Sequence, residues 1–515
     1  MCYRSDIRQA IAKINIFKEK EVTMSEVYDL RSAIDLLKTI PGEFVETDVE
    51  VDPKAELSGV YRHVGAGGTV MRPTNANGPA MMFNTIKDHP DGRVVIGMLC
   101  TRKRVAALLG TSPDKLGFFM RDAVQNPIDP VDFAGDKAPC QEIVHYATDE
   151  GFDIRKIVPA PTNTPEDAGP YITMGLCYAS DPEDPSISDV TIHRLCLQSE
   201  DELSMWITPG ARHIGAFYEK AEKLNQPLPI SISIGLDPAI YLASGFEPPT
   251  TPIGYNELAA AGALRGKPVE LANCITIGEK AVANAEFVIE GLLMPHDRVP
   301  EDRSTGTGKA MPEFPGQTGP APMVPIIKVK AVTTRINPIM QTTIGPSGEH
   351  VHMAGLPTEA SIIGMVERAM PGRLLNVYAH PSGGGKYMAI LQFKKGMPSD
   401  EGRQRQAALL AFSAFSELKH VILVDEDVDP FDDSDVLWAM NTRYQGDIDT
   451  ITIPGVACHV LDHTQEPTYN PMIRNRGVSC KTIFDCTAPF ALKDHFGRSK
   501  FMDVDPKHWL PDMFD

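Results

Sequence analysis

Apolar and polar side chains alternate along much of the first two thirds of the chain, with the period of two that is typical of β-strands. Residues 171–178 and 189–198 show this alternation, and we expect them to pair as neighbouring strands. Residues 93–100 and 229–236 are short apolar runs of the kind that form buried strands. Further extended segments are expected at residues 44–62, 286–293, 326–334 and 339–344.

Other segments repeat their apolar residues every three to four positions, which indicates amphipathic helices. In residues 27–37 the side chains of Leu30 and Leu37 fall on the same side. Residues 256–264 are rich in alanine and place Glu257 in the first turn of a short helix. Further helices are expected at residues 103–109, 359–369 and 402–418.

The last third of the chain has a different order of elements. Short apolar runs that indicate strands, at residues 374–378, 387–393 and 421–424, alternate with the helix at 402–418. Alternation of strands and helices is typical of an α/β domain. We therefore expect a body over residues 25–350, a linking region over 351–375 and a second domain over 376–515.

Residues 295–325 interrupt the pattern with a long stretch rich in glycine and proline. Most connections in compact domains are much shorter, and unstructured loops of such length are usually functional or disordered. This stretch also carries Glu313, whose carboxyl group can exchange protons. We therefore interpret it as an active-site loop.

Composition and charge narrow the classes of protein. The chain of 515 residues is long enough for two or three domains, and its net charge of −19 argues against binding nucleic acid phosphates. No apolar run approaches the roughly 20 residues that span a bilayer. Residues 1–24 lack the apolar segment of a secretory signal, so we treat them as an N-terminal extension, with Met1 or Met24 as the native start.

Nine cysteines are scattered along the chain, and none forms a CxxC pair. An odd number of cysteines in a large chain fits the reduced thiols of a cytoplasmic protein better than a disulfide framework. Cys480 and Cys486 lack the second pair that a structural zinc site would need, so we interpret them as packing residues.

Three separate segments offer ligands for a metal ion. Asp189, His213 and Glu257 supply a carboxylate, an imidazole and a second carboxylate, a set that suits a hard or borderline divalent cation. Arg194 follows the first of them and provides a permanent positive charge for an anionic group. The same residue types also have structural roles, as an acid at the end of a strand, a buried histidine and an acid in the first turn of a helix.

Four further motifs accompany these segments, at residues 167–173, 310–316, 383–386 and 424–429. They read Asp-Ala-Gly-Pro-Tyr-Ile-Thr, Ala-Met-Pro-Glu-Phe-Pro-Gly, Gly-Gly-Gly-Lys and Val-Asp-Glu-Asp-Val-Asp. In this order, the segments closely resemble the UbiD family of reversible decarboxylases, and within it the branch that acts on hydroxylated benzoates. The resemblance extends from about residue 27 to about residue 501. We interpret the acids of the last motif as a solvated loop or a subunit contact.

The resemblance implies a fold of the α/β (α+β) class. Residues 25–350 would form a flavin-binding domain built on a split β-barrel. A helical linker over 351–375 would join it to a C-terminal α/β domain over 376–515 that serves oligomerisation. Homodimers, or hexamers built from dimers, are the assemblies that the family suggests.

The resemblance also implies a cofactor, prenylated FMN. Loss of CO2 from an aromatic ring needs an electron sink that side chains do not supply, and the chain has neither a Walker A nor a GxGxxG motif. In the family, Mn²⁺ or Mg²⁺ joins the flavin phosphate to ligands that match Asp189, His213 and Glu257. Many relatives have asparagine at the first of these positions. The lysine that holds the phosphate in ferulate-type relatives aligns with Ser413.

Further positions match the family's cofactor contacts. The implied flavin-binding residues are Thr191, Ile192, His193, Arg194, Arg212, His213, Ser244, Gly245, Phe246 and Glu257. A potassium ion is implied nearby, with ligands at Ser244, Glu257, Asp485 and the backbone oxygens of Phe246 and Arg443.

The implied catalytic residues begin with Arg194 and its partner acid Glu313. In cinnamate-type relatives a second glutamate follows five residues later as the proton donor, but this chain has Gln317-Thr318 there. The proton donor is therefore missing or displaced. Positions that match substrate-site residues of the hydroxybenzoate branch are His350, Lys386 and His459. Ordinary alternatives remain, such as a turn lysine at Lys386 and a surface histidine at His459.

These implications give a leading hypothesis: non-oxidative decarboxylation of gallate to pyrogallol or of protocatechuate (3,4-dihydroxybenzoate) to catechol, reversible at high CO2. A flavin prenyltransferase would supply the cofactor, and 4-hydroxybenzoate or another aromatic acid is the alternative substrate. From the residues alone, a metal-dependent hydrolase without flavin is also consistent with the two acids and the histidine. A binding or scaffold protein without turnover is the third hypothesis.

Overall fold

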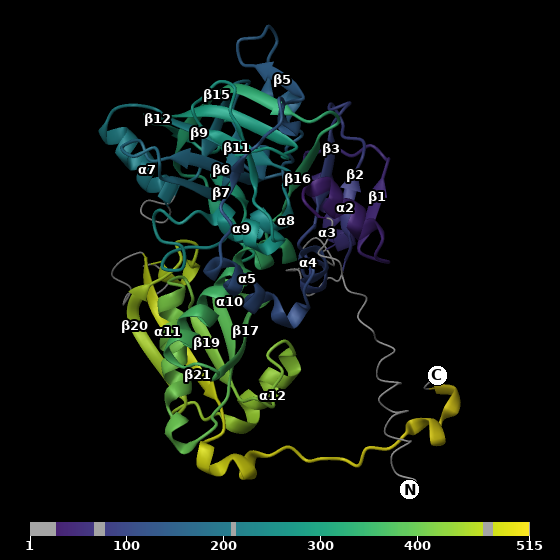
Figure 1. Ribbon diagram of the computed structural model, residues 1–515, viewed down its shortest axis with the longest axis vertical. Helices are drawn as coiled ribbons and strands as arrows, with labels where there is room; N and C mark the ends of the chain where they lie inside the picture. Colours follow the sequence, from purple (N-terminus) through teal and green to yellow (C-terminus); the bar gives the residue numbers. More distant parts are fainter. Residues whose placement is uncertain (1–26, 66–77, 208–212, 467–476, 514–515) are drawn as a thin grey trace.

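The computed structural model describes residues 27–65, 78–207, 213–466 and 477–513. Two bodies lie one above the other along the longest axis of the molecule (Figure 1). The upper body contains the barrel strands and the N-terminal elements, and the lower body contains the C-terminal sheet. The extension expected over residues 1–24 lies outside the described residues. Within the described part, no helix has both the length and the apolar character needed to cross a membrane.

A closed barrel of six strands forms the centre of the upper body. The strands follow the order β12-β9-β6-β7-β8-β15, β12 pairs again with β15 to close the ring, and β5 extends the sheet beyond β15. Barrel strands share a buried apolar cluster that includes Ile230, Ile232 and Ile289. Their bounds are β5 (Ile143–Tyr146), β6 (Tyr171–Ser180), β7 (Ser188–Leu197), β8 (Glu202–Met205), β9 (Leu228–Ile234), β12 (Phe287–Pro300) and β15 (Met323–Thr334).

The expected pairing of residues 171–178 with 189–198 is confirmed, because β6 and β7 run antiparallel as neighbours. Asp189 lies opposite Ala179, and Thr191 lies opposite Cys177. Strand β7 therefore carries Asp189 near its start and Arg194 five residues further along. This rigid strand fixes the spacing between the candidate metal ligand and the candidate catalytic arginine.

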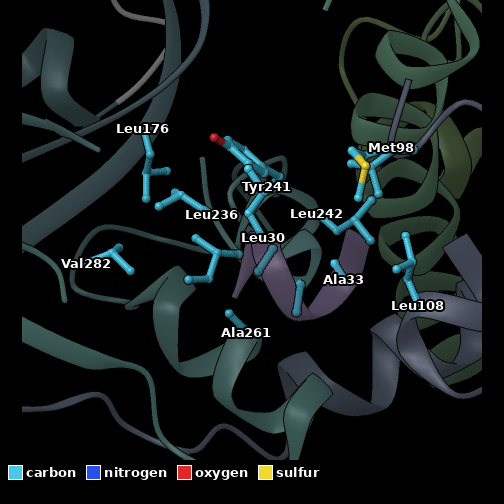
Figure 2. Close-up of a cluster of buried hydrophobic side chains, with 14 of the residues drawn as sticks. Leu30, Ala33, Met98, Leu108, Leu176, Leu236, Tyr241, Leu242, Ala261 and Val282 are labelled. Atoms are coloured by element: carbon cyan, nitrogen blue, oxygen red, sulfur yellow. The ribbon is translucent and has the colours of Figure 1, made fainter. Parts of the chain in front are cut away.

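Helices and a small sheet pack around the barrel. Figure 2 shows Leu30 of α2, Tyr241 and Leu242 of α8, and Ala261 of α9 converging in one buried cluster. The cluster holds the end of α8 and the start of α9, which lie next to Ser244 and Glu257, two residues expected to contact a cofactor or a metal ion. The elements are α2 (Leu30–Lys38), α3 (Glu56–Gly65), α4 (Arg102–Leu109), α5 (Leu116–Gln125), α7 (His213–Lys223), α8 (Pro238–Ala243), α9 (Glu257–Arg265), and the sheet of β1 (Phe44–Thr47), β2 (Ala80–Phe83), β3 (Arg93–Ile96) and β16 (Ile339–Thr342).

The lower body is an α/β domain, as the alternation of elements predicted. Its sheet has the order β17-β18-β19-β21-β20, and the long helix α10 (Gly348–Ala369) leads into it from the upper body (Figure 1). The sheet is mixed: β18, β19 and β21 are parallel to one another, and the edge strands β17 and β20 are antiparallel to their neighbours. The elements are β17 (Leu374–Ala379), β18 (Met388–Phe393), α11 (Arg403–Ala414), β19 (His420–Val424), α12 (Asp433–Arg443), β20 (Thr450–Ala457) and β21 (Val478–Cys486).

Three of the expected elements were wrong. Residues 56–62 belong to helix α3, where Leu57, Tyr61 and Gly65 recur every four positions and are buried. The stretch 295–325 is not a loop: β12 continues to Pro300, and a separate two-stranded hairpin follows, formed by β13 (Lys309–Pro312) and β14 (Thr318–Pro320). The helix expected from residue 359 begins at Gly348, where the side chain of Ser347 accepts the hydrogen bond of an N-cap.

The expected fold class, α/β (α+β) with a flavin-type β-barrel, a linking helix and a C-terminal α/β domain, is confirmed by these elements. The division at residues 25–350, 351–375 and 376–515 stays a prediction. Three smaller strands, β4 (Val131–Asp132), β10 (Glu270–Asn273) and β11 (Lys280–Val282), form a sheet of their own.

Candidate active site

Arg194 lies buried between two glutamates. Its Nε and one terminal nitrogen donate to the two carboxylate oxygens of Glu301, at 2.9 and 2.7 Å. The other terminal nitrogen donates to Glu313. The ring of Trp206 covers the face of the guanidinium, with its centre 4.4 Å from the central carbon. Two acids and one aromatic ring therefore hold the guanidinium of Arg194 in one orientation.

Glu301 is the residue that sequence reasoning missed. It follows directly after β12, is almost fully buried, and also accepts a hydrogen bond of 3.0 Å from the hydroxyl of Tyr171. Glu301 precedes Glu313 in the chain, whereas the second glutamate of cinnamate-type relatives, the proton donor, follows it at the position of Gln317-Thr318. Strand β13 and the turn before it separate the two glutamates in sequence, and no short-range pattern links Glu301 to Arg194.

Glu313 occupies the tip of the β13–β14 hairpin and is buried. Burial raises the pKa of Glu313, the charge of Arg194 partly offsets this rise, and the nearby Glu301 adds to it. A carboxyl group with a raised pKa keeps its proton to higher pH than an ordinary glutamate and can release it to a reacting atom. The geometry therefore suits a proton carrier at Glu313 and an anchoring acid at Glu301.

The structure brings the other proposed catalytic residues to the same place. A cavity of about 630 Å³ lies between the two bodies, within the size range of cofactor and ligand sites. Arg194, Glu313, His350, Lys386 and His459 all line it. The ring of Phe314 joins them, with T-shaped contacts at 5.7 Å to His350 and 4.8 Å to His459.

Lys386 reaches the cavity from the tight turn before β18. Gly384 and Gly385 have φ values of +66° and +77°, a backbone region that favours glycine. The Nζ of Lys386 lies 2.6 Å from the carboxylate of Glu417 and 3.9 Å from that of Glu247. Lys386 thus lies in a turn and is at the same time an ion-paired residue of the cavity wall.

The two histidines of the cavity differ in origin. His350 lies in the first turn of α10, and burial together with the charge of Lys386 lowers its pKa to about 4, so that its ring is neutral at physiological pH. His459 is buried and follows β20, so the alternative of a surface histidine is wrong. Its Nδ1 accepts a hydrogen bond of 3.0 Å from the backbone of Leu461.

Asp189, His213 and Glu257 form a compact cluster, with one ligand atom of each within 4.8 Å of the others. The Nδ1 of His213 lies 3.4 Å from Asp189. One carboxylate oxygen of Glu257 is buried without a hydrogen-bond partner, and burial beside Asp189 raises the pKa of Glu257 to about 9. Two buried acids with an unsatisfied oxygen are the arrangement that a divalent cation would neutralise, so the residues fit a metal site.

Several of the residues expected to contact the flavin line either the cavity or the hollow beside this cluster. Ile192 and His193 of β7 line the cavity, and Thr191 donates a hydrogen bond of 3.0 Å to Asp189. Phe246, after α8, lies beside the metal cluster. Ser244 and Gly245 precede it in the same buried turn, where Gly245 packs closely against Met353. Arg212 lies outside the described residues.

The expected potassium ligands have partners of their own. Asp485 of β21 accepts a hydrogen bond of 2.6 Å from Arg405, and the hydroxyl of Ser244 donates to the carbonyl of Ile240 at 2.7 Å. The side chain of Arg443 donates to Asp425 and Asp427, whereas its expected potassium ligand is the backbone oxygen. The potassium site stays a prediction. Ser413, expected where relatives have a phosphate-binding lysine, is exposed on α11.

Comparison with known protein families covers nearly the whole chain. Models of the N-terminal, Rift-related and C-terminal domains of 3-octaprenyl-4-hydroxybenzoate carboxy-lyase match residues 36–124, 132–348 and 351–486. The chain belongs to the UbiD family. The UbiD resemblance inferred from the motifs is thereby confirmed.

Individual UbiD relatives are similar over nearly the full length. Gallate decarboxylase of Lactiplantibacillus plantarum is 57% identical over 93% of this chain and 97% of its own. The structure of apo 3,4-dihydroxybenzoic acid decarboxylase from Enterobacter cloacae has a TM-score of 0.89 and 59% identity, covering 95% of this chain and 100% of that one. The evolved dimeric form of the UbiD-class enzyme HmfF from Pelotomaculum thermopropionicum, in complex with prFMN, has a TM-score of 0.78 and 30% identity over 93% and 97%.

Proposed function

We propose that the protein catalyses the reversible, non-oxidative decarboxylation of hydroxylated benzoates, gallate to pyrogallol or protocatechuate to catechol. The observation that carries this proposal is the single cavity that combines Arg194 and its two glutamates with Lys386, His350 and His459. High identity to gallate and 3,4-dihydroxybenzoate decarboxylases supports the choice of substrate. Decarboxylation of 4-hydroxybenzoate or another aromatic acid is the alternative.

Prenylated FMN is the cofactor that we infer, held by β7, by the turn after α8 and, through Mn²⁺ or Mg²⁺, by Asp189, His213 and Glu257. Bound there, it supplies the electron sink that a departing carboxylate on an aromatic ring requires. The unsatisfied oxygen of Glu257 and the complex of HmfF with prFMN support this assignment. The potassium ion at Ser244 and Asp485 is part of the same proposal.

Arg194 and the two acids would have different roles in proton transfer. Loss of CO2 from the ring carbon requires a proton in its place, and Glu313 is the acid of the cavity that can deliver one. Glu301 keeps the guanidinium of Arg194 in position, so that Glu313 remains beside a fixed positive charge both with and without its proton. In the carboxylating direction Glu313 would take the proton back.

The basic residues of the cavity would receive the ring hydroxyls. Lys386 is a cation, the buried His350 is neutral, and His459 has its Nδ1 occupied by a backbone donor. Such a set stabilises the negative charge that a phenolic oxygen gains as electrons move through the ring. This is the part of the cavity that would distinguish hydroxylated benzoates from benzoate itself.

The partners that we propose follow the family. A flavin prenyltransferase supplies the cofactor, and the C-terminal domain forms a homodimer, or a hexamer of dimers. The eight described cysteines are free thiols, which supports our proposal of a reducing, cytoplasmic location.

Co-expression with a flavin prenyltransferase, followed by assay of purified protein on a panel of hydroxybenzoates, tests the proposal. We expect CO2 release from protocatechuate or gallate, and no release from benzoate. Release only from 4-hydroxybenzoate would select the alternative substrate. Turnover of an ester or amide without bound flavin would instead support a metal-dependent hydrolase.

A further inference from the structure

One acid of the cavity wall, Glu417, contacts two of the proposed substrate-binding residues at once. One of its carboxylate oxygens lies 2.6 Å from the Nζ of Lys386. The other lies 3.5 Å from the Nε2 of His459. The side chains of Lys386 and His459 are 11% and 8% exposed, and that of Glu417 is 23% exposed, so the contact lies largely out of solvent. A single carboxylate therefore links the two basic groups.

The loop that carries Glu417 is held in place by a lysine of strand β21. Lys481 of β21 is buried, and its ammonium donates hydrogen bonds to the carbonyl oxygens of Ser416, at 2.6 Å, and of Leu418. Burial lowers the pKa of Lys481 to about 8. The backbones of both residues next to Glu417 are thus held in place, and they define the position from which the Glu417 side chain extends.

The same loop is tied to the segment that carries Lys386. The backbone amides of Lys419 and His420 both donate to the carbonyl oxygen of Tyr387, at 3.0 and 2.8 Å. The ring of Phe415 lies beneath Lys386, with its centre 5.7 Å from the ammonium. Because Tyr387 follows Lys386 directly, these contacts fix the distance between the ammonium and the carboxylate.

The hydrogen bonding of His459 determines which of its nitrogens can donate. The backbone N–H of Leu461 donates to Nδ1 at 3.0 Å, so Nδ1 acts as the acceptor. The neutral ring then carries its proton on Nε2, the atom that faces Glu417. The single N–H of His459 therefore faces Glu417, whereas the ammonium of Lys386 has three N–H groups, of which one is directed to Glu417.

We propose that Glu417 is a positioning residue that holds the ring of His459 and the ammonium of Lys386, so that the remaining N–H groups of Lys386 face the ring hydroxyls of the substrate. The inference rests on the proposed function and specifies how the hydroxyl groups are recognised. Adjacent hydroxyls on a ring are two acceptors at a fixed separation, and an ammonium with one N–H on Glu417 keeps two N–H groups for them. The other titratable groups that face this trio are Glu247, Glu313, His350, Tyr387, Cys458 and Asp462.

The test compares Glu417→Gln, which keeps the shape and removes the charge, with Glu417→Asp, which keeps the charge. Glu46→Gln is the matched control, because Glu46 also pairs with a lysine, at 3.0 Å, on the exposed surface far along the chain from the cavity. We expect Glu417→Gln to lower kcat/KM for protocatechuate about 10- to 100-fold, the effect of one charge-assisted hydrogen bond. Glu417→Asp should keep at least a tenth of wild-type activity, and Glu46→Gln all of it.

A second readout does not depend on the substrate. An ammonium released from its carboxylate loses its proton more readily and reacts faster with trinitrobenzenesulfonate, measured at Lys386 by peptide mass spectrometry. We expect labelling about fivefold or more faster in holoenzyme carrying Glu417→Gln, with flavin content and Tm close to wild type.

The two readouts separate the inference from the proposed function. Unchanged kcat/KM in Glu417→Gln, or unchanged labelling of Lys386, would overturn the positioning role. Loss of flavin or a large fall in Tm in both Glu417 variants would show a structural role and would also overturn it. If wild-type holoenzyme releases no CO2 from any hydroxybenzoate, the proposed function fails, and the recognition of ring hydroxyls fails with it even where Lys386 labels faster.

Discussion

Replacing Glu301 with glutamine removes one of the two negative charges on Arg194 while keeping the size of the side chain. Glu301 makes two hydrogen bonds to the guanidinium, is about 1% exposed and also accepts from Tyr171. Removing one partner of a buried pair costs about 3–5 kcal/mol, but Glu313 remains on Arg194 and the amide oxygen keeps one bond. We therefore expect the free energy of unfolding to fall by roughly 2–3 kcal/mol, which corresponds to about 2–5 °C in Tm for a chain of this size.

The effect on catalysis has a defined sign. The charge of Glu301 contributes to the raised pKa of Glu313, so neutralising it lowers that pKa. The two carboxylates lie on either side of one guanidinium, and removing one negative charge makes the ionised form of the other more favourable. Glu313 then loses its proton at lower pH, so the alkaline limb of the kcat profile moves to lower pH.

The assay is CO2 release by the holoenzyme between pH 5.5 and 9. Glu359→Gln is the matched control, because Glu359 is equally buried and pairs with Arg102 at 2.7 Å away from the cavity lining. The control should lower Tm by a similar amount and leave the alkaline limb in place. An unmoved limb in Glu301→Gln, or a shift to higher pH, would refute the reasoning about Glu313.

Three further predictions concern the metal site, the neutral histidine and the cavity turn. Glu257→Ala should lose the divalent metal and at least tenfold in flavin affinity, and metal analysis that still finds one equivalent of Mn²⁺ would contradict the assignment. Because burial and Lys386 lower the pKa of His350 to about 4, its ring signals in nuclear magnetic resonance should not titrate between pH 5.5 and 8. A Cβ added at Gly384 would lie 2.3 Å from the ring of Phe314, so Gly384→Ala should lower kcat at least tenfold. Gly402 has a similar φ but open space around it, so Gly402→Ala should lower only Tm, by a few degrees. Equal kcat in both variants would be evidence against a role for the Phe314 contact.

The spacing of apolar residues within short segments correctly predicted several individual strands and helices. The alternation in residues 171–178 and 189–198 identified the strand pair that carries Asp189 and Arg194, because a half-buried strand needs that period. The start of α9 was also correct, with Glu257 in its first turn after Asn256. Helix α3 was missed, because residues 44–62 were read as one extended segment although Leu57 and Tyr61 repeat at helical spacing.

Some residues of the candidate site could be predicted from the sequence, and others could not. Motif likeness placed Lys386, His350 and His459 in one site, and the structure brings them to one cavity. Glu301 and Glu417 were not found, because each contacts its partner only after distant segments pack, across 107 residues to Arg194 and 31 residues to Lys386. Contacts of that kind leave no periodicity in the sequence.

The most direct test of the central claim is the cofactor content and activity of the same preparation. Protein co-expressed with a flavin prenyltransferase should contain about one prenylated FMN and one Mn²⁺ or Mg²⁺ per chain, and should release CO2 from protocatechuate or gallate. Asp189→Ala and Glu257→Ala preparations should lack metal, flavin and turnover together. A wild-type preparation that turns over hydroxybenzoates fully without flavin or metal would contradict the account.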